Sequence, residues 1–201
     1  MALLPTTPAP NGVNIETVSN NLTTFAFSGR RQTKSQGAQY FKFDLRYPNM
    51  RQSDSAPIMA FITGVRGQFT SFTVRLPEIS QNSASYTGSN PAVDNASDYA
   101  VGATSVAYDG ASNSTAILKA GDFITFSGHT KAYMVTADST SDGTGAGTIA
   151  FTPPLITAVT DDETIAVKDV DFTVIMDDDT AQFNHGLGSI TGISFTVREV
   201  L

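Results

Sequence analysis

The chain contains no cysteine and no tryptophan, and only two of its 201 residues are histidine. Because cysteine is missing, disulfide bonds and thiolate metal sites are excluded, and the sequence says nothing about the redox compartment. No apolar run approaches the ~18–20 residues of a membrane-spanning helix, so we expect no membrane anchor. Met1–Pro8 has neither a basic segment nor a long apolar core. This argues against a signal peptide and indicates a protein made in the cytoplasm.

Charged residues are also scarce, at 15% of the chain, whereas 40% of the residues are hydrophobic. Abundant Ser, Thr, Asn and Gly complete a composition typical of a β-rich protein with many turns. The charge is unevenly distributed, because residues 1–75 carry a net +5 and the remainder a net −12. The asymmetry has two interpretations. It is ordinary surface charge, or it serves head-to-tail assembly, in which the basic region of one copy faces the acidic region of the next.

The segment 37–72 predicts a strand, a short helix and the start of a second strand. Apolar and charged residues alternate strictly in the first strand, Phe41-Lys42-Phe43-Asp44-Leu45-Arg46-Tyr47. This period of two indicates one buried and one wet face. The apolar residues that follow have helical spacing instead and form one stripe, Ile58, Phe61, Ile62 and Val65.

The ends of this helix are predicted from residues that suit caps. Ser53–Ser55 offers side-chain oxygens for the N-cap, and Pro57 suits the first turn. Gly67 suits a left-handed C-terminal cap. The strand pattern resumes at Phe69–Leu76.

We predict a mainly β fold: an antiparallel β-sandwich with one short helix, interrupted by an inserted small β-barrel or sandwich. The predicted parts are a flexible N-terminal arm (1–14), a sandwich domain (15–77 plus 170–201), a polar linker (78–99) and the inserted barrel (100–169).

Within the sandwich, Leu22–Ser28 predicts the first strand and Gly29–Gly37 a basic hairpin connection.

The histidines and the acidic clusters, which are the residues most able to carry chemistry, are interpreted as structural. His129 lies in a predicted turn and His185 in a predicted loop, and no Gly-x-Ser-x-Gly motif supplies a nucleophile for either. Asp161–Glu163 and Asp177–Asp179 lack the spacing of a calcium loop and are interpreted as solvated turns. We therefore predict no catalytic, cofactor-binding or metal-binding residue, and we do not expect an enzyme.

Two further candidates concern phosphate groups. Ser141–Gly147 holds a Gly-x-Gly-x-Gly string, but a strand rather than a helix is predicted after it, which argues against a phosphate loop. Arg30, Arg31 and Lys34 form a basic group without interleaved aromatic residues, on a chain that is acidic in total. We therefore expect no sequence-specific binding of nucleic acid.

The order of the motifs resembles that of the distal tail proteins of long-tailed bacteriophages. The resemblance rests on the 37–72 segment with its Arg66-Gly67-Gln68-Phe69 string, on Leu118–Val135 and on Asp138–Leu155. It extends from about Thr24 to Glu199. Arg66–Gln68 is carried over as a fold element with no binding role.

This resemblance implies a structural virion protein, assembled in the host cytoplasm and located at the tail tip. The family forms a ring, usually a hexamer, that joins the tail tube to the baseplate and receptor-binding apparatus. The implied partners are further copies of the chain, the tail tube protein and the tail-tip hub or baseplate proteins. In the insert, Phe123, Phe126 and Tyr133 alternate as core residues would, which puts direct receptor binding in doubt.

Two other classes stay open at this point. One is another tail subunit, from the tail tube or the tail terminator. The other is a carbohydrate-binding β-sandwich module.

Overall fold

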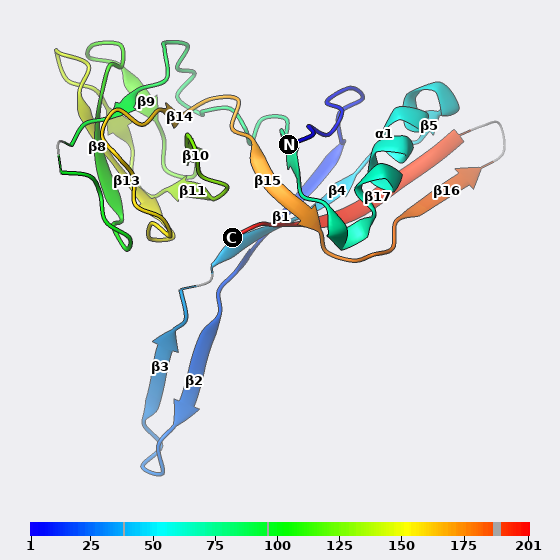
Figure 1. Ribbon diagram of the computed structural model, residues 1–201, viewed down its shortest axis with the longest axis horizontal. Coiled ribbons are helices and arrows are strands. Elements are labelled where there is room, and N and C mark those ends of the chain that lie inside the picture. The colour runs from blue at the N-terminus through cyan, green and yellow to red at the C-terminus, as the bar shows by residue number, and fades with distance from the viewer. Residues whose placement is uncertain (38, 96, 187–189) are drawn as a thin grey trace.

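The computed structural model describes residues 1–37, 39–95, 97–186 and 190–201. Figure 1 shows a sheet carrying a helix, a small barrel beside it, and a hairpin that projects from the sheet. The predicted class is confirmed: the described residues are mainly β, with antiparallel sheets, one α-helix and an inserted, nearly closed barrel. We call the sheet with its helix the body.

The body is built on a seven-stranded sheet. Its main path runs β1 (Gly12–Val18), β4 (Tyr40–Arg46), β17 (Ile190–Glu199), β15 (Phe172–Met176) and β6 (Phe72–Val74). Two further strands pair with β17, namely β16 (Gln182–Gly186) and β5 (Met50–Arg51). The predicted alternation in β4 is confirmed, because Phe41, Phe43 and Leu45 are buried on one face.

The helix α1 (Gln52–Val65) lies over this buried face. Ile58, Ile62 and Val65 are buried, and Phe61 is half-buried, so the predicted apolar stripe is confirmed. The predicted side-chain cap is wrong. Arg51 occupies the N-cap position without a capping hydrogen bond.

The start of α1 differs for a local reason. The Ser53 hydroxyl donates to Oδ1 of Asp54 at 3.1 Å, so these two polar groups pair with each other. Pro57 lies inside the helix, beyond its first turn. At the other end Arg66 already adopts the left-handed conformation (φ 58°). Gly67, the predicted left-handed cap, also has a positive φ (62°) and opens a 3-10 turn, η1 (Gly67–Phe69), whose last residue the sequence assigned to the following strand.

The first residues of the chain contact the body. Leu3 forms a parallel bridge with Thr73, and the N–H of the buried Leu4 donates to the Thr73 carbonyl at 2.9 Å. The segment predicted as a flexible arm is therefore packed along β6 near its start. It joins the sheet at Gly12, where the sequence offered no periodic signal.

The barrel is a six-stranded sheet that curls until its two edges meet. Its order is β14 (Ile165–Ala166), β10 (Phe123–Phe126), β11 (Ala132–Val135), β13 (Gly147–Thr152), β8 (Ser105–Asp109) and β7 (Ala92–Val93), with β9 (Ala116–Leu118) and β12 (Ser139–Thr140) paired beside it. The Val93 N–H donates to the Glu163 carbonyl at 2.9 Å, and the Ile165 N–H donates to the Pro91 carbonyl at 2.9 Å. Strand β7 lies in the segment predicted as a linker, so that segment contributes to the barrel.

The barrel is an excursion from the body. The chain leaves the sheet after β6 and returns in β15, and these two strands pair with each other. The body sheet is thus continuous across the point of insertion.

Candidate functional site

The most exposed element is the hairpin of β2 (Asn21–Phe25) and β3 (Arg31–Ser35), and we call residues 19–37 the hairpin arm. Figure 1 shows it pointing away from both body and barrel. It forms a two-stranded sheet of its own, and every residue of both strands is exposed. The strand predicted at Leu22–Ser28 exists in part, but it lies outside the core to which the sequence assigned it.

The arm prolongs the pairing of β1 with β4. That pairing ends at Val18 opposite Tyr40, and the N–H of Gln36 then donates to the Asn20 carbonyl at 3.0 Å. At the tip, the N–H of Ala26 donates to the Arg30 carbonyl at 2.9 Å. The turn is closed by Gly29, whose φ of +78° favours glycine. The arm is therefore held by its own hairpin hydrogen bonds and by its continuity with the β1–β4 pairing.

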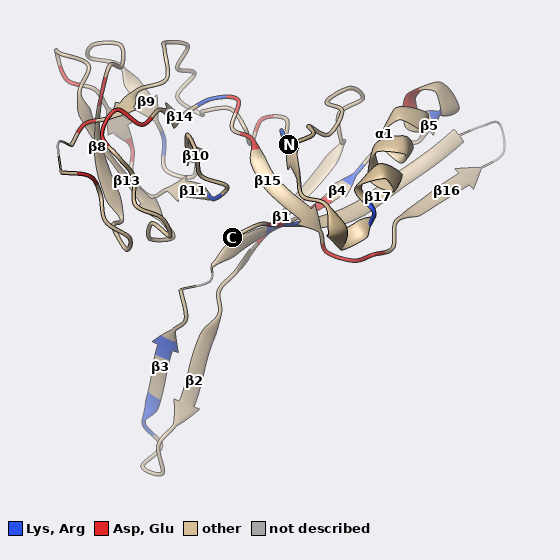
Figure 2. Ribbon diagram, viewed as in Figure 1, with Lys and Arg blue, Asp and Glu red and all other residues tan. Residues whose placement is uncertain are grey.

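The arm carries apolar and basic side chains in the open. Leu22, Phe25 and Phe27 are 58%, 69% and 112% exposed. The arm has three basic residues and no acidic one, and Figure 2 shows basic residues on β3 and acidic residues on the loop between β15 and β16 and in the barrel loops. An isolated two-stranded hairpin is at best marginally stable in water. The arm is therefore an element that a partner surface would stabilise.

A buried ion pair fixes the barrel on the body. Lys131, just before β11, pairs with Glu199 at the end of β17, and both side chains are fully buried. The Glu199 oxygens also accept the N–H of Ala132 at 2.6 Å and the N–H of Phe41 at 3.2 Å. Burial raises the pKa of the Glu199 carboxyl and lowers the pKa of the Lys131 ammonium, and their mutual attraction opposes both shifts.

Aromatic packing reinforces the same junction. Phe123 of the barrel meets Phe41 edge-on, with ring centres 5.1 Å apart, and meets Phe172 at 5.2 Å. The ammonium of Lys131 lies 4.7 Å from the ring centre of Phe41. The barrel thus shares a core with the sheet, and Phe123 and Ala132 belong to the core cluster of the body.

The two histidines lie in different parts of the molecule. The side chain of His129, in a barrel turn, is 7% exposed, and its Nε2 lies 3.6 Å from Oε1 of Glu163. His185 lies on β16 rather than in a loop and is exposed, with Nδ1 3.0 Å from the hydroxyl of Thr191. The structure therefore places His129 beside Glu163 of one acidic cluster, whereas the side-chain partner of His185 is Thr191.

The acidic clusters serve as turns that are tied to neighbouring segments. Oδ1 of Asp161 accepts the N–H of Asn95 at 2.9 Å, and Asp177 forms an ion pair with Lys42 at 2.7 Å. Oδ1 of Asp179 accepts the N–H of Gln68 at 2.9 Å, so the Arg66–Gln68 string joins the end of α1 to this turn. Across the described ranges, no group of three or more His, Asp or Glu could hold a metal ion.

The glycine-rich loop is filled by its own carboxylate. Oδ1 of Asp142 accepts the N–H and the hydroxyl of Thr144, both at 2.7 Å, and the N–H of Ala146 at 3.0 Å. The loop leads into β13, as predicted, and not into a helix. The groups that would bind a phosphate are thus already bonded to Asp142.

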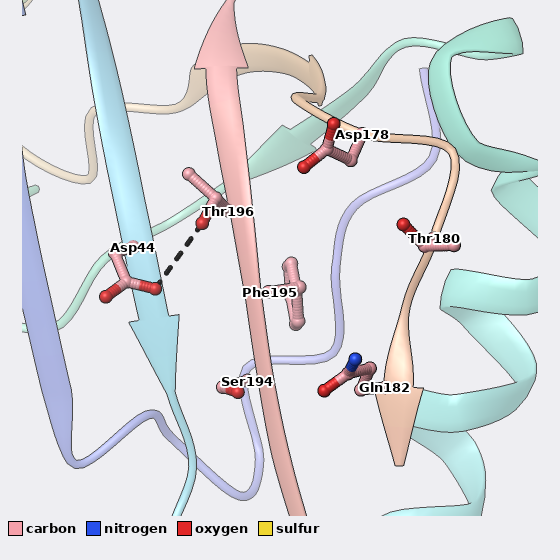
Figure 3. Close-up of a pocket in the computed structure, with 7 residues that line it drawn as sticks. All are labelled: Asp44, Asp178, Thr180, Gln182, Ser194, Phe195 and Thr196. Atoms are coloured by element: carbon pink, nitrogen blue, oxygen red, sulfur yellow. Dashed lines mark hydrogen bonds between the residues drawn. The ribbon is translucent and has the colours of Figure 1, made fainter.

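The outward face of the body sheet holds a shallow recess (Figure 3) that the sequence gave no signal for. It has a volume of about 220 Å³ and is lined by Asp44, Asp178, Thr180, Gln182, Ser194, Phe195 and Thr196. Asp44 and Thr196 meet because they are register partners on β4 and β17, and the hydroxyl of Thr196 donates to Oδ1 of Asp44 at 3.5 Å. Besides this long hydroxyl–carboxylate contact, the lining offers hydroxyl, amide and carboxylate groups for polar contacts.

Comparison with known proteins leaves the resemblance without independent support, since no protein-family model and no curated protein matches the chain. In the part of the chain that the structure describes, no helix is long and apolar enough to cross a membrane.

Proposed function

We propose that the chain is a structural subunit of a virion tail, resembling the distal tail protein that joins the tail tube to the tail-tip apparatus. On this proposal it acts by assembly, without catalysis. Its partners are further copies in a ring, with a hexamer expected, together with the tail tube protein and the tail-tip hub or baseplate proteins. It is located at the tail tip of the virion.

One observation carries the proposal: the barrel is inserted between two adjacent strands and is clamped there. Because β6 and β15 pair directly, the body sheet keeps its continuity while the barrel stands beside it. The buried pair of Lys131 and Glu199 and the packing of Phe123 hold the barrel in one orientation. A connector between two layers of an assembly needs such a rigid link between the part that forms the ring and the part that meets the next layer.

The carbohydrate-binding alternative has less support. Sugar rings stack on exposed aromatic side chains, but Phe123, Phe126 and Tyr133 of the insert are buried. The exposed Phe25 and Phe27 lie on the hairpin arm and not in the insert. A tail-tube or terminator subunit remains the main alternative, and it differs from a distal tail protein in where it lies on the tail.

Labelling of intact virions separates these possibilities. An antibody against the chain, bound to gold particles and imaged on virions that carry this protein, should mark the tail tip alone. Pre-immune serum is the control. Gold along the tube, at the head-proximal end of the tail, or absent from virions would contradict the proposal.

A further inference from the structure

We infer that the hairpin arm docks on a second copy of this chain, with its basic strand facing an acidic surface of that copy. The inference rests on the proposed function only because both require self-association. It adds the segment that makes the contact and the kind of surface that receives it.

The first argument is that the arm lacks cover. From residue 19 to residue 37 no side chain is buried, and only Ala26 is half-buried. The body and the barrel each have a buried core cluster, but Leu22, Phe25 and Phe27 belong to neither and stay in water. Several large exposed apolar side chains on one short segment are typical of a contact surface.

The second argument concerns the two faces of the arm. Leu22 is the register partner of Lys34, and Phe25 is the register partner of Arg31. Directly opposed residues share a face, and these two pairs lie on opposite faces because side chains alternate along a strand. Each face therefore presents one large apolar and one basic side chain. An arm of this kind suits a site that contacts it on both faces, as a cleft between neighbouring elements would.

The third argument is charge complementarity. The arm carries a net +3 with no acidic residue, whereas the rest of the chain carries a net −10. A second copy thus supplies the opposite charge that the arm requires, and the contact is head-to-tail because arm and acceptor surface differ. Basic and apolar side chains also suit nucleic acid, so binding to nucleic acid is an outcome that the experiment must separate.

Two arm variants and one control test the inference in the full-length chain. The first variant replaces residues 19–39 by Asn-Gly, which joins Val18 to Tyr40 by a two-residue hairpin turn. The second is Arg30→Glu/Arg31→Glu. The control, Arg51→Glu/Arg66→Glu, makes the same change in net charge at two exposed arginines of the body.

We expect the wild type and the control to assemble, and both arm variants to show the mass of a single chain in light scattering. That mass is close to 21.3 kDa for the substituted variant and lower for the variant that lacks the arm. The melting temperatures of the arm variants should stay within a few degrees of the wild type, because none of the changed residues that the structure describes is buried. Assembly should also weaken with added salt, since exposed charges are screened within ~10 Å at 0.1 M.

Arm variants that assemble as well as the wild type would overturn the inference while leaving the proposed function intact. A control that loses assembly equally would also overturn it, because net charge and not the arm would then be responsible. Binding of a DNA or RNA oligonucleotide by the wild type, lost in the arm variants without any change in self-association, would assign the arm to nucleic acid. A wild type that is monomeric under all conditions would contradict both proposals.

Discussion

Lys131 and Glu199 lie 68 residues apart in the sequence and form a fully buried ion pair where the barrel meets the body. The carboxylate of Glu199 also receives backbone N–H groups from both parts, Ala132 of the barrel and Phe41 of the body. The Glu199 side chain therefore contacts β4 of the body and the start of β11 of the barrel, and the barrel cannot shift without breaking the bonds of Glu199 to Lys131 and Ala132.

Removing either partner of this pair should be strongly destabilising. We expect Lys131→Met or Glu199→Gln to lower the free energy of unfolding by about 3–5 kcal/mol, because the remaining group is left buried without its partner. The double variant should lose clearly less than the sum of the two. Urea unfolding of the single and double variants measures these free energies. Strictly additive losses would show that the two groups are not coupled. The control is the exposed ion pair of Lys119 and Asp138, whose removal should lower the free energy of unfolding much less.

Phe123 should contribute to the junction through packing. We expect Phe123→Ala to lower the free energy of unfolding by about 3–5 kcal/mol, since it leaves a cavity between two aromatic rings. The matched control is Phe69→Ala, because Phe69 is 79% exposed and should change stability by less than about 0.5 kcal/mol. Equal effects in the two variants would show that Phe123 is not part of the core.

Two glycines of one loop should respond differently to the same substitution. Gly145 has a φ of +85°, and a Cβ there would meet the Ala111 carbonyl, whereas a Cβ on Gly143 meets no atom within 4 Å. We expect Gly145→Ala to cost at least about 1–2 kcal/mol, and Gly143→Ala to be neutral or slightly stabilising. The melting temperatures of the two variants, measured by thermal unfolding, test this difference. Similar melting temperatures would argue against this loop conformation.

The same loop should make stability depend on acid pH. The pKa of the Asp142 carboxyl lies below its ordinary value because the Thr144 hydroxyl and backbone N–H groups, Ala146 first among them, donate to it. A lowered pKa in the folded state contributes stability above the unfolded value, about 3.8, and this contribution disappears as the pH falls through the folded pKa.

We therefore expect Asp142→Asn to be less stable than the wild type at pH 7, with the difference shrinking as the pH drops below 3.8. Unfolding curves recorded from pH 7 to strongly acidic pH test this. A difference that stays constant over the whole range would rule out the charge of Asp142 as its cause.

Sequence periodicity predicted the elements whose burial is decided locally. The alternation of Phe41, Phe43 and Leu45 identified a half-buried strand, and the stripe that includes Ile58 and Ile62 identified α1. Each pattern reflects one element with one buried face, so a short window of sequence contains the whole signal.

The hairpin arm shows where such a signal fails. Phe25 and Phe27 alternate with small residues as they would in a core strand, and they formed the basis of a strand predicted inside the sandwich. Alternation reports that a strand has an apolar face, but not whether the same chain covers that face. Here the described residues leave it exposed.

The junction and the recess were missed for a different reason. Lys131 stands in a predicted turn, where a lysine is usually solvated, and only its pairing with Glu199 explains its burial. Asp44 and Thr196 share a recess because of the register between β4 and β17. Contacts between distant segments depend on the complete topology, which no local pattern contains.

The central claim is that the chain works by assembling with itself. The most direct test is the native mass of the purified wild type, measured by light scattering at low ionic strength and accompanied by negative-stain images. The account predicts a closed ring of roughly six copies, consistent with the cyclic symmetry of most homo-oligomers. A mass of 21.3 kDa at every concentration, with no rings in the images, would contradict it.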